Sequence, residues 1–209
     1  MPLIVLEHDL AAHIVAQLRD ETTSPTHFRR LTSALTQILI AEATRSMPTR
    51  LQTVKTPLEA TSVRVLSHAP VLAPVLRAGL GMLDAAIELL PEASVGYLGL
   101  QRDELTAVAS PYYAKLPPVS GKLALLLDPM LATGGSAAWA ANQLYVAGAA
   151  EVRLLCIVAA PNGVQHLAET FPHLTVITAA LDRELNDKSY ILPGLGDFGD
   201  RLYGTFPLV

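Results

Sequence analysis

The sequence predicts an α/β fold built on a doubly wound, mainly parallel sheet, and three observations support this. Short aliphatic runs alternate with helical segments, which is typical of parallel strands covered on both faces. The length fits one domain, and no repeat, low-complexity tract or composition break divides residues 1–209. Charged residues and glycines follow several of the runs, at the strand ends where such folds bind ligands.

The N-terminal segment, about residues 8–47, is predicted to be helical. Ser24 and Pro25 form a helix start, because serine caps a first turn and proline has the backbone angle of the first helical position. The residues that then recur at helical spacing, up to the segment AEATR, are Phe28, Leu31, Leu35, Ile38 and Leu39.

Aliphatic runs and the segments between them define the rest of the series. The predicted strands are 69–76, 94–100, 122–128, 151–160 and 174–181. The predicted helices are 79–90, 135–146 and 162–170, with Gly148 just beyond the second.

Composition and charge narrow the classes of protein. Hydrophobic residues make up 51% and charged residues 16%, so either another subunit covers apolar surface or an alanine- and leucine-rich core is well filled. The net charge of −4 argues against broad electrostatic binding of nucleic acid. No apolar run reaches the ~18 residues of a spanning helix, and no signal peptide is recognisable. With a single cysteine, Cys156, the chain has no internal disulfide, and we expect a soluble, cytoplasmic protein.

The stretch LLLDPMLATGGS, at 125–136, joins a strand end to a turn suited to an anion. Asp128 ends the strand, and Thr133, Gly134, Gly135 and Ser136 stand at the helix start. Free backbone N–H groups and the positive helix end favour a phosphate, and glycines let the backbone close on it. For TGGS alone, an ordinary turn capped by Ser136 is an equal alternative. The preceding aspartate, suited to accept hydrogen bonds from sugar hydroxyls, favours a phosphosugar site.

Two other predicted strands end in arginine. PVLRAGLG, at 74–81, places Arg77 before Ala-Gly and a helix, a second anion site of similar design, because the guanidinium fork binds two phosphate oxygens. LQRDE places Arg102 beside two acids, which alone is equally typical of a solvated ion pair. The six histidines have no metal-ligand spacing.

Two irregular segments remain. The segment at about 103–120, rich in tyrosine and proline, is either an extended arm or flap or a plain surface hairpin. The tail, about 182–209, contains YILPGLGDFGDRLYGTF at 190–206, which reads as too irregular for a strand or helix. Its glycine-rich backbone is suited to present N–H and C=O groups to a flat ligand.

These motifs resemble the type I phosphoribosyltransferase family in its uracil phosphoribosyltransferase form. LLLDPMLATGGS is similar to the loop that binds phosphoribosyl diphosphate (PRPP), and PVLRAGLGM, RDE, YYAKLP and YILPGLGDFGDRLYGT are similar to the other signatures, in the same order. The resemblance spans nearly the whole chain, and its tail is specific to the uracil branch.

The resemblance implies a set of site residues. PRPP would be bound by Arg77, Arg102, Asp128, Pro129, Met130, Leu131, Ala132, Thr133, Gly134, Gly135, Ser136 and Asp197. Uracil would be bound by Ile191, Gly196, Asp197 and Phe198. Catalysis would rest on Arg77, Arg102, Asp128 and Asp197, with Mg²⁺ carried by the diphosphate rather than held directly by the protein. The loop at Arg77 would contain a non-proline cis peptide.

The implied reaction transfers the phosphoribosyl group of PRPP to N1 of uracil, giving UMP and diphosphate, a step of pyrimidine salvage. The tail departs from the resemblance at Phe198, where the family usually has alanine; a ring beside the base is expected to alter the pocket, so another nucleobase stays an alternative. A non-catalytic regulator that senses PRPP and binds nucleic acid is a further alternative, disfavoured by the acidic balance. Relatives imply a GTP effector and a homodimer or higher homo-oligomer, held partly by the 109–120 arm.

Overall fold

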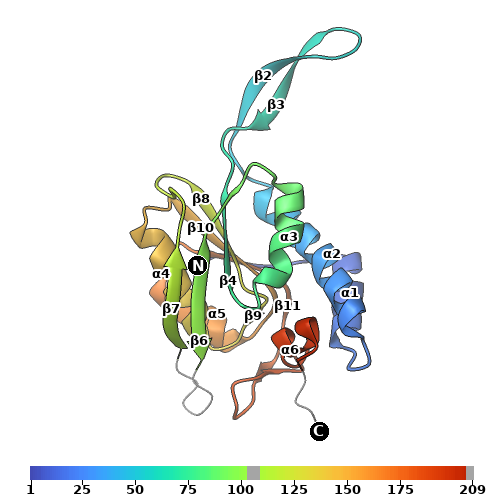
Figure 1. The fold of residues 1–209 in the computed structure, drawn as a ribbon, viewed down its shortest axis with the longest axis vertical. Helices are drawn as coiled ribbons and strands as arrows, with labels where there is room; N and C mark the ends of the chain where they lie inside the picture. Colours follow the sequence, from blue (N-terminus) through green and yellow to red (C-terminus); the bar gives the residue numbers. More distant parts are fainter. Residues whose placement is uncertain (103–108, 206–209) are drawn as a thin grey trace.

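The central sheet confirms the predicted α/β class. In the computed structural model, which describes residues 1–102 and 109–205, this sheet contains nine strands (Figure 1). The main order is β1 (Leu3–Val5), β11 (Thr175–Leu181), β10 (Glu151–Ala159), β8 (Leu123–Leu127), β4 (Val71–Leu76), β6 (Tyr97–Arg102) and β7 (Ala109–Lys115). The remaining strands are β5 (Ser94–Val95), beside β4, and β9 (Met130–Leu131), beside β10. The described pairs are parallel except β6 with β7.

Helices cover both faces of the sheet, as doubly wound topology requires. One face carries α1 (Asp9–Arg19), α2 (Pro25–Thr44), α3 (Leu80–Leu89) and α6 (Phe198–Tyr203). The other carries α4 (Gly135–Val146) and α5 (Pro161–Thr170). Alternate residues of β8 divide between the two cores: Leu125 and Leu127 join the first, and Ala124 and Leu126 the second.

The predicted helix starts and stops are present at α2 and α4. The Ser24 hydroxyl accepts a 3.4 Å hydrogen bond from the His27 backbone N–H, and Pro25 opens α2. Beyond the end of α4, Gly148 has φ +90°, a left-handed conformation that glycine adopts without strain.

The predicted strand 94–100 is divided. Gly96 separates β5 from β6 and donates to the Leu72 carbonyl at 2.9 Å. A Cβ on Gly96 would lie 2.6 Å from the end of the Leu116 side chain and 2.9 Å from the Pro117 ring, so a larger residue would require both to shift.

A projecting hairpin occupies residues 49–66, a region without a sequence prediction. It consists of β2 (Thr49–Lys55) and β3 (Ala60–Leu66), paired in register from Thr49 with Leu66 to Lys55 with Ala60. It extends away from the sheet as a two-stranded ribbon (Figure 1). The hairpin is largely exposed, including Leu51 on β2 at 72% and Leu58 in the connecting turn at 95%.

Part of the 103–120 region, for which an arm or a surface hairpin was predicted, lies in the described sheet. Strand β7 pairs antiparallel with β6 at the edge of the main sheet. Residues 103–108 lie outside the described part of the chain, so the predicted flap there has no structural description. The segment that protrudes is instead the β2–β3 hairpin.

The prediction of an irregular tail was wrong. Strands β12 (Glu184–Leu185) and β13 (Ile191–Leu192) pair, and α6 follows. The Asp197 carboxylate caps α6 by accepting from the Asp200 N–H at 3.0 Å, and Gly204, at φ +72°, ends it. The tail thus combines a short ribbon with a capped helix.

Candidate active site

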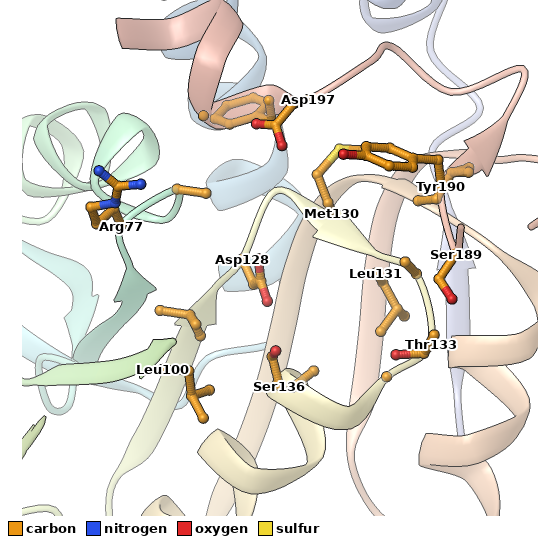
Figure 2. A pocket seen from close by; sticks show the side chains of 18 of the residues that line it. Arg77, Leu100, Asp128, Met130, Leu131, Thr133, Ser136, Ser189, Tyr190 and Asp197 are labelled. Atoms are coloured by element: carbon orange, nitrogen blue, oxygen red, sulfur yellow. The ribbon is translucent and has the colours of Figure 1, made fainter. Parts of the chain in front are cut away.

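A cavity of about 230 Å³ lies at the carboxyl ends of the central strands (Figure 2). Four segments line it: the end of β4 with its turn, Leu100 of β6, the loop from β8 into the start of α4, and the tail. Its lining residues are Val75, Leu76, Arg77, Ala78, Leu100, Asp128, Met130, Leu131, Ala132, Thr133, Gly134, Ser136, Ala137, Ser189, Tyr190, Ile191, Gly196, Asp197, Phe198 and Gly199. Most of the predicted site residues, although far apart in sequence, therefore share one cavity.

Asp128 begins the loop between β8 and α4. The residue is only 9% exposed, and its backbone N–H donates to the Leu155 carbonyl at 3.2 Å. Figure 2 shows its carboxylate in the same cavity as the hydroxyls of Thr133 and Ser136. Three oxygen groups suited to a sugar and a phosphate are thereby gathered at one strand end.

The turn at Gly134 points the start of α4 into this cavity. Gly134 has φ +87° and is the cap residue of α4, with no side-chain capping bond. A Cβ there would lie 3.1 Å from the Gly163 carbonyl oxygen at the start of α5, so both backbone angle and space favour glycine. The alternative of Ser136 as the cap is wrong, because Ser136 lies within the helix and lines the cavity. The first N–H groups of α4 remain available for an anion.

Arg77 enters from β4. The Leu76–Arg77 peptide bond is cis and non-proline, as the resemblance implied. The Arg77 carbonyl accepts a 3.2 Å hydrogen bond from the Tyr203 hydroxyl, which ties the turn to α6. Burial raises the pKa of Tyr203, with Arg77 opposing that shift, so its hydroxyl keeps its proton at neutral pH.

Three predicted PRPP residues are not among the cavity lining. Arg102 ends β6, and its side chain lies outside the described part of the chain. The Pro129 carbonyl accepts from the N–H groups of Ile157 at 2.9 Å and Val158 at 3.2 Å, which fixes the loop to β10. Gly135 is the first residue of α4.

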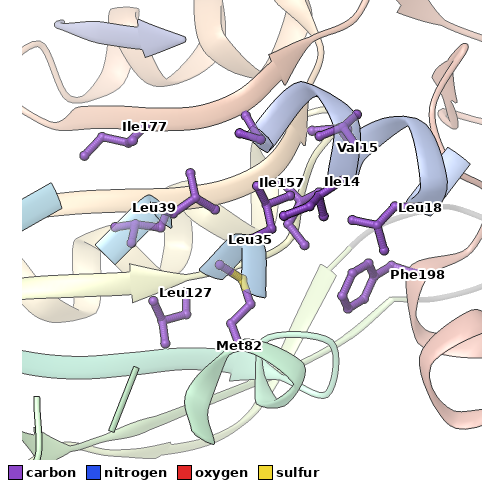
Figure 3. Close-up of a cluster of buried hydrophobic side chains, with 14 of the residues drawn as sticks. Ile14, Val15, Leu18, Leu35, Leu39, Met82, Leu127, Ile157, Ile177 and Phe198 are labelled. Carbon is purple, nitrogen blue, oxygen red and sulfur yellow. The ribbon is translucent and has the colours of Figure 1, made fainter. Parts of the chain in front are cut away.

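The predicted uracil residues all line the cavity, and the Phe198 ring also packs in the core. Only 2% of Phe198 is exposed, and its ring packs edge-on against Phe28, with centroids 5.2 Å apart. Figure 3 shows it within the core cluster beside Leu18. A Cβ on Gly81 would lie 2.6 Å from the Leu202 side chain and 3.4 Å from the Phe198 ring, so the glycine gives room mainly to Leu202, which packs in the same cluster. The ring therefore packs into the core, although the residue also lines the cavity, and its expected effect on the pocket stays a prediction.

Replacing Phe198 with leucine should separate packing from recognition. We expect the free energy of unfolding to fall by about 1 kcal/mol, because buried ring contacts are lost. The KM for uracil should stay within about twofold, since the ring is directed away from the cavity. Thermal unfolding and initial rates measure both quantities, and a changed preference between uracil and cytosine would contradict this orientation.

Several lining residues were missed, chiefly Ser189 and Tyr190. Ser189 has φ +62°, and the Asn186 carboxamide oxygen accepts from the N–H groups of Lys188 at 3.0 Å and Tyr190 at 2.9 Å. This asparagine-centred turn brings both residues to the cavity. The polar run Asn-Asp-Lys-Ser before the tail was the sequence signal for it.

Other reactive groups lie away from the cavity. Burial raises the pKa of the Cys156 thiol to about 12, so this thiol is neutral and unreactive near pH 7. Within residues 1–102 and 109–205, His, Cys, Asp and Glu side chains form no group of three placed to hold a metal ion. No helix in that part of the chain is long and apolar enough to cross a membrane.

Comparisons with known proteins place these features in one family. Residues 5–205 match the family model described as uracil phosphoribosyltransferase. The uracil phosphoribosyltransferase of Kineococcus radiotolerans is 47% identical over 210 residues, covering 98% of this chain and 100% of that protein. That of Campylobacter curvus is 44% identical over 202 residues, covering 96% and 97%.

Solved structures agree with the fold. The AQ2163 protein of Aquifex aeolicus is 36% identical, with a TM-score of 0.94 over 99% of this chain and 100% of that one. A hypoxanthine phosphoribosyltransferase of Staphylococcus aureus is 12% identical, with a TM-score of 0.53 over 86% and 84%, and is similar in fold alone.

Proposed function

The chain belongs to the uracil phosphoribosyltransferase family, and from this premise we propose how its cavity performs the family's reaction. The protein is an enzyme that transfers the phosphoribosyl group of PRPP to N1 of uracil, giving UMP and diphosphate. One observation supports the site assignment above all. A single cavity joins the Asp128 loop, the Arg77 turn and the glycine-rich tail.

The 5′-phosphate is assigned to the turn from Thr133 to Ser136. The start of α4 offers backbone N–H donors and the positive end of a twelve-residue helix. The two hydroxyls add donors. Asp128, which follows β8, is assigned to the 2′- and 3′-hydroxyls of the ribose. It lines the same cavity as the turn assigned to the phosphate.

The diphosphate is assigned to the side of the cavity where Arg77 lies (Figure 2). A guanidinium can bind two of its oxygens, and the resemblance assigns Arg102 to the same group. The oxygen-rich lining fits Mg²⁺, which usually binds through one or two carboxylates together with substrate phosphates. The diphosphate would carry Mg²⁺ into the cavity, with Asp197 beside the ion or its waters, and the ion would neutralise charge on the diphosphate.

Uracil is assigned to the tail. Backbone groups at Ile191, Gly196 and Phe198 line the cavity and are suited to the flat edge of a pyrimidine. Gly196 has φ +79°, a conformation in which its backbone can face a ligand without side-chain obstruction. Because the Phe198 ring is turned into the core, room for the base is retained.

The reaction then follows from orientation and charge. The bond from C1′ to the diphosphate oxygen breaks, with its electron pair leaving on the diphosphate. The new bond from C1′ to uracil N1 forms on the opposite face, and the N1 proton is released. Arg77 stabilises the charge that develops on the leaving group, and Asp128 faces the ribosyl group, which becomes positive. Such chemistry requires no protein nucleophile.

Initial rates with PRPP, Mg²⁺ and four bases test this proposal. We expect UMP from uracil, and turnover of cytosine, hypoxanthine and orotate lower by roughly 10⁴-fold, because a wrong base leaves buried polar groups unpaired. If PRPP bound but no base reacted, a non-catalytic sensing regulator would replace the enzyme. Faster turnover of another base than of uracil would show that this base is the preferred substrate.

A homodimer through the β2–β3 hairpin is the second part of the proposal. An isolated two-stranded ribbon is marginally stable in water, and this one exposes apolar side chains and unpaired edges. A second copy of the chain that covers the ribbon would bury the apolar side chains and cover the unpaired strand edges. The 109–120 region includes β7, an edge strand of the main sheet, and its part in the dimer contact stays a prediction.

Replacing Leu51 and Leu58 together with serine should weaken the dimer. We expect the dissociation constant to rise by at least roughly tenfold, because each buried leucine contributes about 1.5–3 kcal/mol. Sedimentation equilibrium measures it, with Val146→Ser as the control, an apolar residue that is 77% exposed on α4. Equal constants for both variants would contradict a hairpin interface.

GTP activation and a cytoplasmic location stay predictions. The family resemblance is the support for GTP, and rates measured with and without GTP test it. The fully buried, unreactive Cys156 suits a reducing compartment, and cell fractionation tests the location.

A further inference from the structure

A largely buried ion pair contacts the tail. Arg19, the last residue of α1, donates from both terminal nitrogens to Asp182, at 2.5 Å to Oδ1 and 2.8 Å to Oδ2. Asp182 follows β11, and its side chain is 4% exposed, against 25% for Arg19. This bidentate geometry is the strongest form of the arginine–carboxylate contact. Neither residue lines the cavity.

The pair holds both backbone groups of one glycine. The Gly194 N–H donates to Asp182 Oδ2 at 2.9 Å, and the Gly194 carbonyl accepts from Arg19 at 2.7 Å. Gly194 therefore has its orientation fixed from two sides. It has φ +61°, and a Cβ there would lie 2.1 Å from the Ile191 carbonyl oxygen. Its backbone is thus packed directly on Ile191, which lines the cavity.

A second arginine fixes the same turn from α6. Arg201 is 7% exposed and donates to the carbonyls of Leu18, Asp20 and, at 2.8 Å, Leu195. Its guanidinium also stacks over the Phe28 ring, 4.6 Å from the centroid. The last turn of α1 is therefore joined to the tail through Arg19 on one side and Arg201 on the other.

The contacts of Arg19, Asp182 and Arg201 therefore hold the turn that contains the backbone assigned to uracil. Gly194 lies between Ile191 and Gly196, both of which line the cavity and are assigned to uracil. Recognition by backbone N–H and C=O groups depends on their orientation, because these groups have no side-chain freedom with which to recover a misplaced contact. A shift of Gly194 would be transmitted to both.

We propose that Arg19 and Asp182 are positioning residues for the nucleobase, which hold the turn 191–196 in the conformation that binds uracil. This inference rests on the proposed assignment of the tail to uracil. Of the residues assigned to PRPP, Arg77 and 128–136 belong to other elements and make no described contact with the pair, and Asp197 alone adjoins the turn. The pair should therefore affect uracil binding more than PRPP binding.

Steady-state kinetics of Arg19→Met, Arg19→Lys and wild type test the proposal. The methionine keeps the aliphatic stem and removes the fork, whereas lysine keeps the charge and one donor. Arg183→Met is the matched control, since Arg183 adjoins Asp182 in sequence but has a 70% exposed side chain paired with Glu184. Thermal unfolding establishes that each variant is folded at the assay temperature.

For Arg19→Met we expect the KM for uracil to rise by roughly tenfold or more, with the KM for PRPP within about twofold. Arg19→Lys should recover part of the loss, and Arg183→Met should match wild type. An unchanged KM for uracil in Arg19→Met, or an equal rise for both substrates, would overturn the proposal. If Arg19→Met does not fold, Arg19→Lys decides: a wild-type KM for uracil overturns the proposal, and a selective rise supports it.

The same assay separates this inference from the function on which it rests. Absence of UMP with wild type and with Arg183→Met would refute the proposed function itself. Normal wild-type turnover with an unaffected Arg19→Met would refute the positioning role and leave the function standing.

Discussion

Replacing Asp128 with asparagine should lower kcat/KM for PRPP by roughly 10²–10³-fold, a loss of about 3–4 kcal/mol in transition-state stabilisation. Asparagine preserves the shape of the side chain but removes its charge and replaces one acceptor with a donor. Asp128 is 9% exposed at the cavity floor, so water cannot readily take over its hydrogen bonds. The ribosyl group also becomes positive as diphosphate leaves, which makes the lost carboxylate more costly in the transition state.

Initial rates at varied PRPP measure this loss, with Asp9→Asn as the control because Asp9 is exposed in the first turn of α1. Equal activity of the two variants would remove Asp128 from the ribose site. A loss confined to the KM for uracil would instead assign Asp128 to the base.

Replacing Gly79 with alanine should damage both stability and the Arg77 turn. A Cβ at Gly79 would lie 2.3 Å from the Leu127 carbonyl oxygen and 2.7 Å from the Val75 backbone nitrogen. These are main-chain atoms of β8 and β4, so relief requires the two strand ends to move apart. Leu127 directly precedes Asp128, and Arg77 is two residues before Gly79. Gly79 is therefore what lets the diphosphate and ribose segments approach each other.

We expect Gly79→Ala to lower the free energy of unfolding by about 3 kcal/mol and the Tm by roughly 6–12 °C, with PRPP binding weakened in parallel. Calorimetric unfolding and titration of PRPP give the two values. Gly121→Ala is the control, because Gly121 has φ +72° but open space around it. This variant tests backbone strain alone, and we expect its free energy of unfolding to fall by about 1 kcal/mol. Equal losses in the two variants would contradict the close-approach argument.

Local patterns were sufficient to predict the site loops, because their signals are contiguous. The run from Leu125 to Ser136 contains a buried strand, an aspartate and a glycine turn within twelve residues. Parallel topology then brings this run beside the end of β4 without further information. The strand and helix starts near Ser24, Arg77 and Gly135 were predicted for the same reason.

The orientation of Phe198 could not be predicted from its neighbours in sequence. The ring packs against Phe28, which lies 170 positions earlier in the chain. The same limit applies to Asp182 and Arg19, whose contact joins α1 to the end of β11. Such partners follow from the assembled fold and not from spacing.

Other misses had signals that were present in the sequence. The hairpin at 49–66 alternates polar and apolar residues, as in ATSVRVL, but neither strand is aliphatic enough to resemble the buried strands of the sheet. Helix α6 is bounded by Asp197 and Gly204, a regular cap and stop that the surrounding glycines obscured.

A crystal structure of the protein with UMP tests the central claim most directly, because one ligand reports the phosphate, ribose and base assignments together. We expect the 5′-phosphate on the N–H groups of 133–136, the ribose hydroxyls on Asp128, and the uracil edge on the backbone of Ile191 and Gly196. A phosphate bound elsewhere, or a base that makes no contact with the tail, would contradict it.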